Sequence, residues 1–126
     1  MSSPDPFCLF VYGTLRRGSR NKFARLLHAQ AQFAGNARMR GRLYRLESYP
    51  GAVSSNTAGE WVRGELYSME DPRWILAALD NYEGPSFERV KLEVERDSGA
   101  RVETWVYLYR GTPPGPRIPS GDWLRP

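Results

Sequence analysis

The order of apolar and polar positions divides the chain into extended segments and two helical ones. Residues 7–12 form an uninterrupted apolar run, rich in aromatic and β-branched side chains and closed by Gly13. Such a run predicts a strand buried on both faces, in the centre of a sheet. Alternating apolar and polar side chains predict further strands at residues 31–46, 61–69, 87–95 and 101–109. The last two flank a turn sequence, Asp97-Ser98-Gly99, which predicts a hairpin.

Two stretches have the three- and four-residue spacing of an amphipathic helix. Asn21 is expected to cap the first, which ends near His28, and this histidine is expected to be exposed at the helix end. The second helix begins at Asp71-Pro72, a carboxylate cap followed by proline in the first turn, and ends at Gly84-Pro85. Its apolar face comprises Trp74, Ile75, Ala78, Leu79 and Tyr82.

Glycine and proline positions indicate how these elements connect. Pro50-Gly51 predicts a turn, after which Ala52 and Val53 return to the core. Gly41, inside an extended segment, predicts a bulge or a tight bend. Residues 111–119 contain four prolines and predict an ordered, irregular wrap. Residues 1–126 are therefore expected to form one α+β domain, with a mixed, mainly antiparallel sheet curled into a small barrel and two short helices.

Composition places the chain among globular proteins. Of its 126 residues, 40% are apolar and 25% are charged, and no apolar run approaches the roughly 20 residues that span a bilayer, so we expect no membrane partner. Residues 1–6 lack the basic and apolar regions of a secretory signal. Cys8 is the single cysteine and lies in the apolar run, which predicts a buried, unreactive thiol and a cytoplasmic protein without an internal disulfide. With one cysteine and one histidine we expect no zinc site and no Cys-His or Ser-His-Asp catalytic set.

The net charge of +4 is unevenly distributed along the chain. Residues 1–63 hold ten basic and three acidic side chains, or +7, whereas residues 64–126 hold eight and eleven, or −3. Arg16, Arg17 and Arg20 follow the first strand directly and predict a positive field over the loop there. This distribution favours an anionic small molecule, and nucleic-acid binding through the arginine-rich first half remains a weaker alternative.

The loop after the first strand is the first candidate site. Gly13 lets the main chain turn sharply and lets another molecule approach it. If the amides of Gly13, Thr14 and Leu15 point the same way, they form a cup of donors for a carboxylate or a developing oxyanion. An ordinary turn between a strand and a loop is the alternative interpretation of the same residues.

Glu83, in the last turn of the second helix, is the second candidate. The carbonyl end of the helix and the neighbouring Asp80 both disfavour a negative charge there, so we expect the pKa of Glu83 to rise if the site is also partly dry. A glutamate tuned in this way transfers protons near neutral pH. A solvated acid at a helix end is the alternative, and Glu88 is a competing carboxylate whose neighbour Arg89 favours a surface ion pair.

These residues carry a resemblance to a known family. Tyr12-Gly13-Thr14-Leu15, followed by Gly18 and Asn21, resembles the opening signature of the γ-glutamylcyclotransferase family in its small, AIG2-like branch. Leu79-Asp80-Asn81-Tyr82-Glu83 is similar to the segment that carries that family's general acid/base glutamate. Four other segments resemble bacterial members: Tyr49-Pro50-Gly51-Ala52-Val53, Gly64-Glu65-Leu66-Tyr67, Trp105-Val106-Tyr107-Leu108-Tyr109 and Ser120-Gly121-Asp122-Trp123-Leu124.

The resemblance implies an enzyme whose substrate is a γ-glutamyl compound. The substrate's α-amine attacks its own γ-carbonyl, which releases 5-oxoproline and an amine or amino acid. Glu83 is then the catalytic residue, and Tyr12, Gly13, Thr14, Leu15 and Tyr109 are expected to bind substrate. A packing role for Tyr109 is an equal alternative, and a non-catalytic module that binds γ-glutamyl or carboxylate ligands is the alternative function. The group on the γ-glutamyl nitrogen is left open: glutathione, another dipeptide, a polyamine or a protein-lysine adduct.

Overall fold

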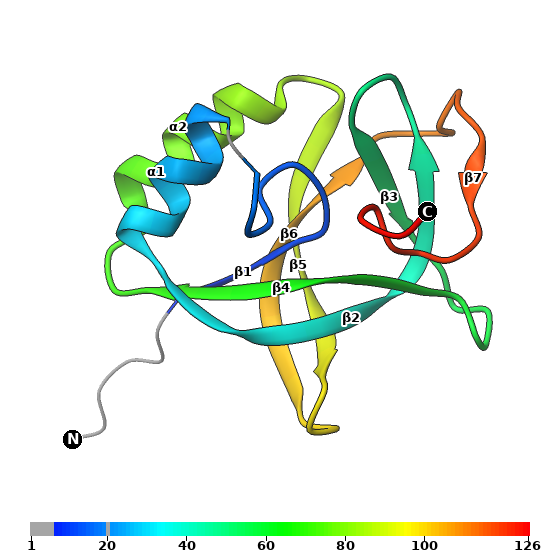
Figure 1. Cartoon of the computed structure of the whole chain (residues 1–126), viewed down its shortest axis with the longest axis horizontal. Coiled ribbons are helices and arrows are strands. Elements are labelled where there is room, and N and C mark those ends of the chain that lie inside the picture. Colours follow the sequence, from blue (N-terminus) through cyan, green and yellow to red (C-terminus); the bar gives the residue numbers. More distant parts are fainter. Residues whose placement is uncertain (1–6, 20) are drawn as a thin grey trace.

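The computed structural model describes residues 7–19 and 21–126 (Figure 1). Arg20 and residues 1–6, for which no secretory signal is expected, lie outside the described part. The strands are β1 (Phe7–Val11), β2 (Gln32–Arg45), β3 (Pro50–Ser54), β4 (Trp61–Met69), β5 (Phe87–Arg96), β6 (Arg101–Tyr109) and β7 (Arg117–Ile118). The helices are α1 (Lys22–Gln30) and α2 (Arg73–Glu83). Neither described helix is long and apolar enough to cross a membrane.

Five strands close into a barrel. Around the ring, β2 pairs with β4, β4 with β1, β1 with β6, β6 with β5, and β5 again with β2. Among the described pairings only that of β1 with β6 is parallel, at Leu9 and Trp105. The strands β3 and β7 extend the far part of β2 outside the ring. The predicted α+β fold, with a mainly antiparallel barrel and two helices, is confirmed.

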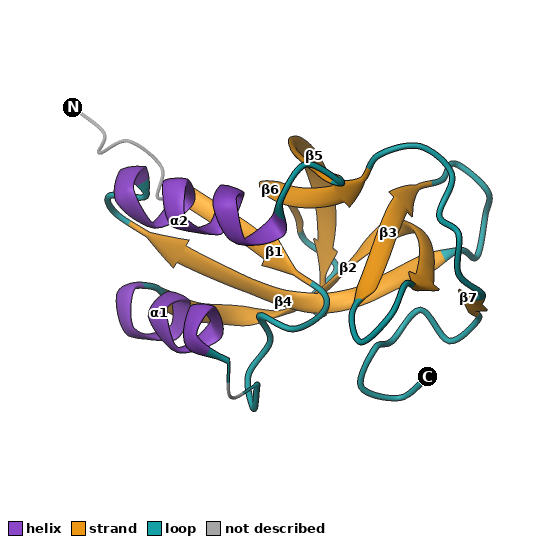
Figure 2. Cartoon of the chain, turned by 90° about the horizontal axis from the view of Figure 1, so that it is seen from above, coloured by secondary structure: helices purple, strands orange, loops and turns teal. Residues whose placement is uncertain are grey.

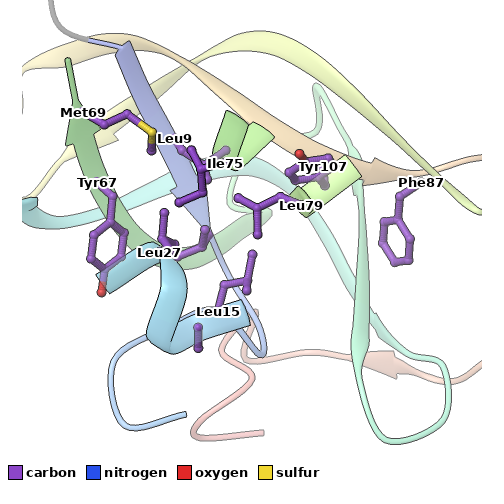
Figure 3. Close-up of a cluster of buried hydrophobic side chains, with 11 residues drawn as sticks. Leu9, Leu15, Leu27, Tyr67, Met69, Ile75, Leu79, Phe87 and Tyr107 are labelled. Atoms are coloured by element: carbon purple, nitrogen blue, oxygen red, sulfur yellow. The ribbon is translucent and has the colours of Figure 1, made fainter. Parts of the chain in front are cut away.

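The helices gather at one end of the molecule. Figures 1 and 2 show α1 and α2 side by side there, while β3, β7 and the C-terminus lie at the other end. Between them β1 separates two apolar cores. Its residues Leu9 and Val11 pack with the helices, and Phe10 packs inside the barrel. Figure 3 shows the first core, in which Leu9 of β1 lies near Leu27 of α1 and Leu79 of α2. The prediction that this strand is central and buried on both faces is confirmed.

Both helix starts follow their predicted signals closely. The side chain of Asn21 accepts a hydrogen bond from the Ala24 amide at 2.7 Å, so α1 begins as predicted, and it ends two residues beyond His28. The Asp71 carboxylate accepts from the Arg73 amide at 3.2 Å, although Pro72 lies just before the first helical residue rather than within the helix. Helix α2 ends at Gly84, as predicted.

Gly41 marks a change of partners along β2. Pairing with β4 ends at Arg40, and pairing with β3 begins at Gly41. A Cβ at Gly41 would lie 2.5 Å from the carbonyl oxygen of Val53, so only glycine allows the strand to bend here. The tight bend is therefore confirmed, whereas the shift in pairing register lies elsewhere, between Phe33 and Gly35.

Two connections differ from the prediction. Pro50 and Gly51 do not form a turn but begin β3, paired with Arg45 and Tyr44. The turn lies in residues 46–49, where the Leu46 amide donates to the Tyr49 carbonyl at 3.0 Å. Proline is tolerated in β3 because the strand lies at the sheet's edge, where an N–H donor is not required. The expected irregular wrap also contains a short strand, β7, which pairs with β2.

Candidate active site

A cavity of about 280 Å³ lies where the end of β1 meets the end of α2. Its size is at the lower end of small-molecule sites. The turn before β3, the start of β5 and the C-terminal part of β6 complete the wall. The lining residues are Phe10, Val11, Tyr12, Gly13, Thr14, Leu15, Ser48, Tyr49, Pro50, Tyr82, Glu83, Phe87 and Tyr107. The structure therefore brings together the loop after β1 and Glu83, which are remote from each other in the sequence.

The loop after β1 is a turn held at several points. The Arg16 amide donates to the Gly13 carbonyl at 3.1 Å, and the Asn21 side chain donates to the Thr14 carbonyl at 2.5 Å. The hydroxyls of Thr14 and Tyr82 lie 2.9 Å apart, which links the loop to the last turn of α2. A Cβ on Gly13 would lie 2.6 Å from Cγ of Pro50, so this wall of the cavity requires glycine.

Gly13, Thr14 and Leu15 all line the cavity. Within the described part of the chain, no hydrogen bond is donated by their amides. Main-chain N–H groups that are not used within the protein can bind an anionic group where they face it. This arrangement has the chemistry expected of a cup for a carboxylate.

Glu83 is the last residue of α2 and lines the same cavity. Burial raises the pKa of its carboxyl to about 7. The direction is the one predicted from the sequence, and burial, the condition of that prediction, is its cause. Asp80 does not contribute, because Arg89 donates to its carboxylate at 3.0 and 3.2 Å and the Tyr107 hydroxyl donates to it at 2.6 Å. Partial burial works to raise the pKa of Asp80, but these hydrogen bonds outweigh it and hold that pKa below its usual value.

Tyr12 contributes its ring to the cavity wall and uses its hydroxyl for structure. The hydroxyl donates to the Tyr107 carbonyl at 2.6 Å and accepts from the Ala52 amide at 3.1 Å. Burial, and then the charge of Glu83, raise the pKa of Tyr12 far above its ordinary value, so the phenol stays neutral. Tyr12 thus connects the end of β1 to β6 and β3.

Tyr109 does not line the cavity. Its ring packs edge-on against Phe87 at 5.6 Å between centroids, and its Cβ closely approaches Gly51. Tyr107, two residues earlier on the same strand, lines the cavity instead. Sequence reasoning missed Tyr107, although the alternation along β6 places both tyrosines on one face. Strand alternation alone does not determine how far along the strand the cavity extends.

Arg16 and Arg17, which belong to the loop after β1, do not line the cavity. Arg16 is only 8% exposed and turns away, donating to Glu65 at 3.2 Å and to Asp122 at 2.9 Å. Arg17 lies over the ring of Phe33 at 3.8 Å and also approaches Glu65. Arg20 is outside the described residues. Glu65, which is buried, pairs with both arginines, and Asp122, which is partly buried, pairs with Arg16. The positive field over the loop stays a prediction.

The other residues considered in the sequence, His28, Glu88 and Cys8, do not line the cavity. His28 is partly buried rather than exposed: its Nε2 lies 2.8 Å from the Leu15 carbonyl oxygen, and its ring stacks on Tyr67. Glu88 is exposed and lies 4.0 Å from Arg110, since Arg89 pairs with Asp80 instead. Cys8 is only partly buried. The described residues contain no group of three or more His, Cys, Asp or Glu side chains that could hold a metal ion.

Comparison with known proteins agrees with this geometry. Residues 9–125 match the family described as "Gamma-glutamyl cyclotransferase, AIG2-like". The chain belongs to this family. A relative from Vibrio cholerae, provisionally named a gamma-glutamylcyclotransferase, is 35% identical over 123 residues, which cover 93% of this chain and 95% of the relative. The mouse gamma-glutamylaminecyclotransferase is 32% identical over 118 residues, covering 79% and 75%.

A further family member acts in a different chemical context. The gamma-L-glutamyl-butirosin B gamma-glutamyl cyclotransferase of Niallia circulans is 34% identical over 111 residues, covering 80% of this chain and 65% of that protein. Among solved structures, an uncharacterized protein from Pyrococcus horikoshii has a TM-score of 0.69 at 26% identity, covering 93% and 89%. A mouse AIG2-like protein has a TM-score of 0.68 at 29% identity, covering 88% and 82%. The fold is therefore the family's fold, whereas the family's named members differ in substrate.

Proposed function

We propose that this chain catalyses the cyclisation of a γ-glutamyl compound, releasing 5-oxoproline. One observation carries the proposal: a carboxyl group whose pKa is about 7 and a loop with unoccupied main-chain donors line a single cavity. The first is suited to proton transfer near neutral pH, and the second is suited to holding a carboxylate. No cofactor takes part in this reaction, and we place it in the cytoplasm.

In the proposed complex, the amides of Gly13, Thr14 and Leu15 hold the substrate's α-carboxylate. This fixes the neighbouring α-amine and lets the chain fold back until the amine faces its own γ-carbonyl. Holding the two reacting groups together removes a large part of the entropic barrier to ring closure. The rings of Tyr12, Tyr82 and Tyr107 enclose the aliphatic part of the glutamyl group.

Glu83 provides the proton transfers. Its carboxylate takes a proton from the α-ammonium, and the freed amine attacks the γ-carbonyl carbon to form the lactam C–N bond. The original amide C–N bond then breaks as the leaving nitrogen is protonated. Of the three ammonium protons, one stays on the lactam nitrogen and two reach the leaving amine. A pKa near 7 allows Glu83 to accept and return these protons with a small free-energy cost in either direction.

The lining of the cavity favours a γ-glutamyl amine over a γ-glutamyl peptide. The described residues that line the cavity include no lysine, arginine or histidine, and Arg20 lies outside the described part of the chain. A second carboxylate on the leaving group, as in a dipeptide, would therefore have no cation to meet. Tyr49, Pro50 and Phe87 offer apolar contacts instead. The name of the mouse relative, a gamma-glutamylaminecyclotransferase, is consistent with this choice.

The test is the Glu83→Gln variant, assayed for 5-oxoproline by mass spectrometry with a γ-glutamyl alkylamine and with glutathione as substrates. We expect turnover to fall at least about a hundredfold with binding of the amine retained, because the amide keeps the shape but cannot take a proton. Glu88→Gln, which removes an exposed acid away from the cavity, serves as the matched control and should retain activity. Full activity of Glu83→Gln would contradict the proposal. Ligand binding by a wild type without turnover on any γ-glutamyl amine would indicate a binding module instead.

A further inference from the structure

A cluster of charged side chains lies behind the loop that lines the cavity. It consists of Arg16, Arg17, Glu65 and Asp122, none of which lines the cavity itself. Glu65 projects from β4, and Asp122 belongs to the C-terminal segment after β7. Glu65 alternates with Gly64 and Leu66 along β4, and its side chain is only 3% exposed. A buried carboxylate that the proposed reaction does not use therefore requires an explanation.

Glu65 binds both the side chain and the main chain of the loop. One carboxylate oxygen accepts from Nε of Arg16 at 3.2 Å. The other accepts from the Arg17 amide at 2.8 Å and from the Tyr67 hydroxyl at 3.0 Å. These bonds hold the loop from the side opposite the cavity. Charge-assisted hydrogen bonds between buried groups are among the stronger polar contacts in a protein.

Asp122 completes the cluster from the other end of the chain. Its Oδ1 accepts from a terminal nitrogen of Arg16 at 2.9 Å, across 106 positions of sequence, and also accepts from the Leu124 amide at 3.0 Å. The segment that carries Asp122 is itself firmly seated on β4. The Arg63 amide donates to the Gly121 carbonyl at 2.8 Å, and a Cβ on Gly121 would collide with the carbonyl oxygen of Trp61. Asp122 is thus a fixed point rather than a loose surface acid.

We infer that Asp122 is a positioning residue for the cavity loop and acts through Arg16. The Arg16 amide closes the turn by donating to the Gly13 carbonyl. Thr14 and Leu15 lie between these two bonded residues, so a displacement of Arg16 also displaces them. Releasing the guanidinium from Asp122 allows that turn to shift and misaligns the three open amides. The effect of Asp122 on catalysis rests on the proposed function, whereas the effect of Asp122 on the conformation of the loop does not.

The kinetic test compares Asp122→Asn with Arg117→Gln. The asparagine has the same shape and keeps an acceptor for Leu124, but it lacks the charge that holds Arg16. Arg117→Gln removes another ion pair of the C-terminal segment, that of Arg117 with Glu60 at 3.1 Å, which does not contact the loop. We expect Asp122→Asn to raise KM for a γ-glutamyl alkylamine about tenfold and to lower kcat, because misaligned amides no longer hold the α-amine against the γ-carbonyl. The pH dependence of kcat should stay unchanged, because Glu83 is not in contact with the cluster. Arg117→Gln should leave KM unchanged.

A second measurement does not require activity. In ¹H–¹⁵N NMR spectra, Asp122→Asn should shift the amide resonances of Gly13, Thr14 and Leu15, and Arg117→Gln should not. If the wild type proves inactive, the proposed function fails and these resonances alone decide the inference. Unchanged loop resonances, or an equal rise of KM in both variants, would overturn it. If Asp122→Asn does not fold, Ser120→Ala removes the hydroxyl that accepts from the Asp122 amide, and a smaller shift of the same resonances is expected.

Discussion

Glu83 and Asp80 lie one turn apart on α2, yet their pKa values move in opposite directions. Glu83 lines the cavity, and burial raises its pKa to about 7. Asp80 is also partly buried, but its hydrogen bonds with Arg89 and Tyr107 hold its pKa below the usual value. The difference depends on which partners the barrel brings to each carboxylate. The proposal that Glu83 transfers protons therefore depends on its surroundings and not on its residue type.

The raised pKa of Glu83 predicts a pH-dependent effect on stability. The unfolded carboxyl titrates near 4.5 and the folded one near 7, so the folded state binds more protons between these values and loses stability as pH rises. We expect Glu83→Gln to be more stable than wild type by about 3 kcal/mol above pH 7, and equal to it below pH 4.5. Urea unfolding at pH 4 and pH 8 measures this. Equal stability at both pH values would show that the carboxyl is not desolvated.

At the scale of elements, the active site depends on where α2 stops. Gly84 ends the helix with φ of 77° and ψ of −173°, a conformation that is essentially restricted to glycine. The Gly84 amide still donates to the Asp80 carbonyl at 3.1 Å, so the final turn stays closed around Glu83. The link between the Thr14 and Tyr82 hydroxyls then joins this helix end to the loop after β1. The helix end and the loop therefore hold their relative positions.

Substituting Gly84 tests whether the geometry of the helix end affects catalysis beyond its effect on the stability of the fold. We expect Gly84→Ala to lower the free energy of unfolding by about 1 to 3 kcal/mol, because alanine cannot adopt this conformation without strain. We also expect kcat to fall, because Glu83 moves with the strained residue. Gly111→Ala is the matched control, since Gly111 has φ of 75° and, like Gly84, open space around it. Denaturant titration and steady-state kinetics should show a stability loss in both variants and a kcat loss only in Gly84→Ala.

At the scale of the whole molecule, the cavity exists because the barrel closes over it. Its wall takes residues from β1, β5 and β6, from the connection before β3, and from α2. Tyr12 directly follows β1, and its buried hydroxyl bonds to Tyr107 on β6 and to Ala52 on β3. One phenol thus ties the central strand to both sides of the opening.

Tyr12→Phe tests this connection. Removing the hydroxyl leaves the buried Ala52 amide without its acceptor, which costs about 1 to 3 kcal/mol of stability. Tyr49→Phe is the control, because Tyr49 is 38% exposed and its hydroxyl makes no hydrogen bond within the described chain. Thermal unfolding should show a clear loss for the first variant and little change for the second. Equal behaviour of the two variants would mean that the hydroxyl of Tyr12 does not hold the strands together.

The sequence by itself determined the features that depend on neighbouring residues. The boundaries of β4 and β6, the Asn21 cap and the end of α2 at Gly84 follow from side-chain periodicity and local hydrogen bonding. The family resemblance also came from short local segments, and the match over residues 9–125 confirms it. The chemical types of the two candidate groups, a loop rich in amide donors and a carboxylate, could likewise be inferred before their positions were known.

Only the tertiary structure decided which of these groups share a cavity. Arg16 points away from the cavity because Glu65 and Asp122, distant in sequence, provide a buried counter-charge. Tyr107 lines the cavity and Tyr109 does not, because the position of the cavity along β6 depends on where β1 and α2 end beside this strand. Pro50 extends an edge strand because β2 is available to pair with it. Burial and charge pairing are sums over residues from the whole chain, and a linear pattern does not contain the distances on which those sums depend.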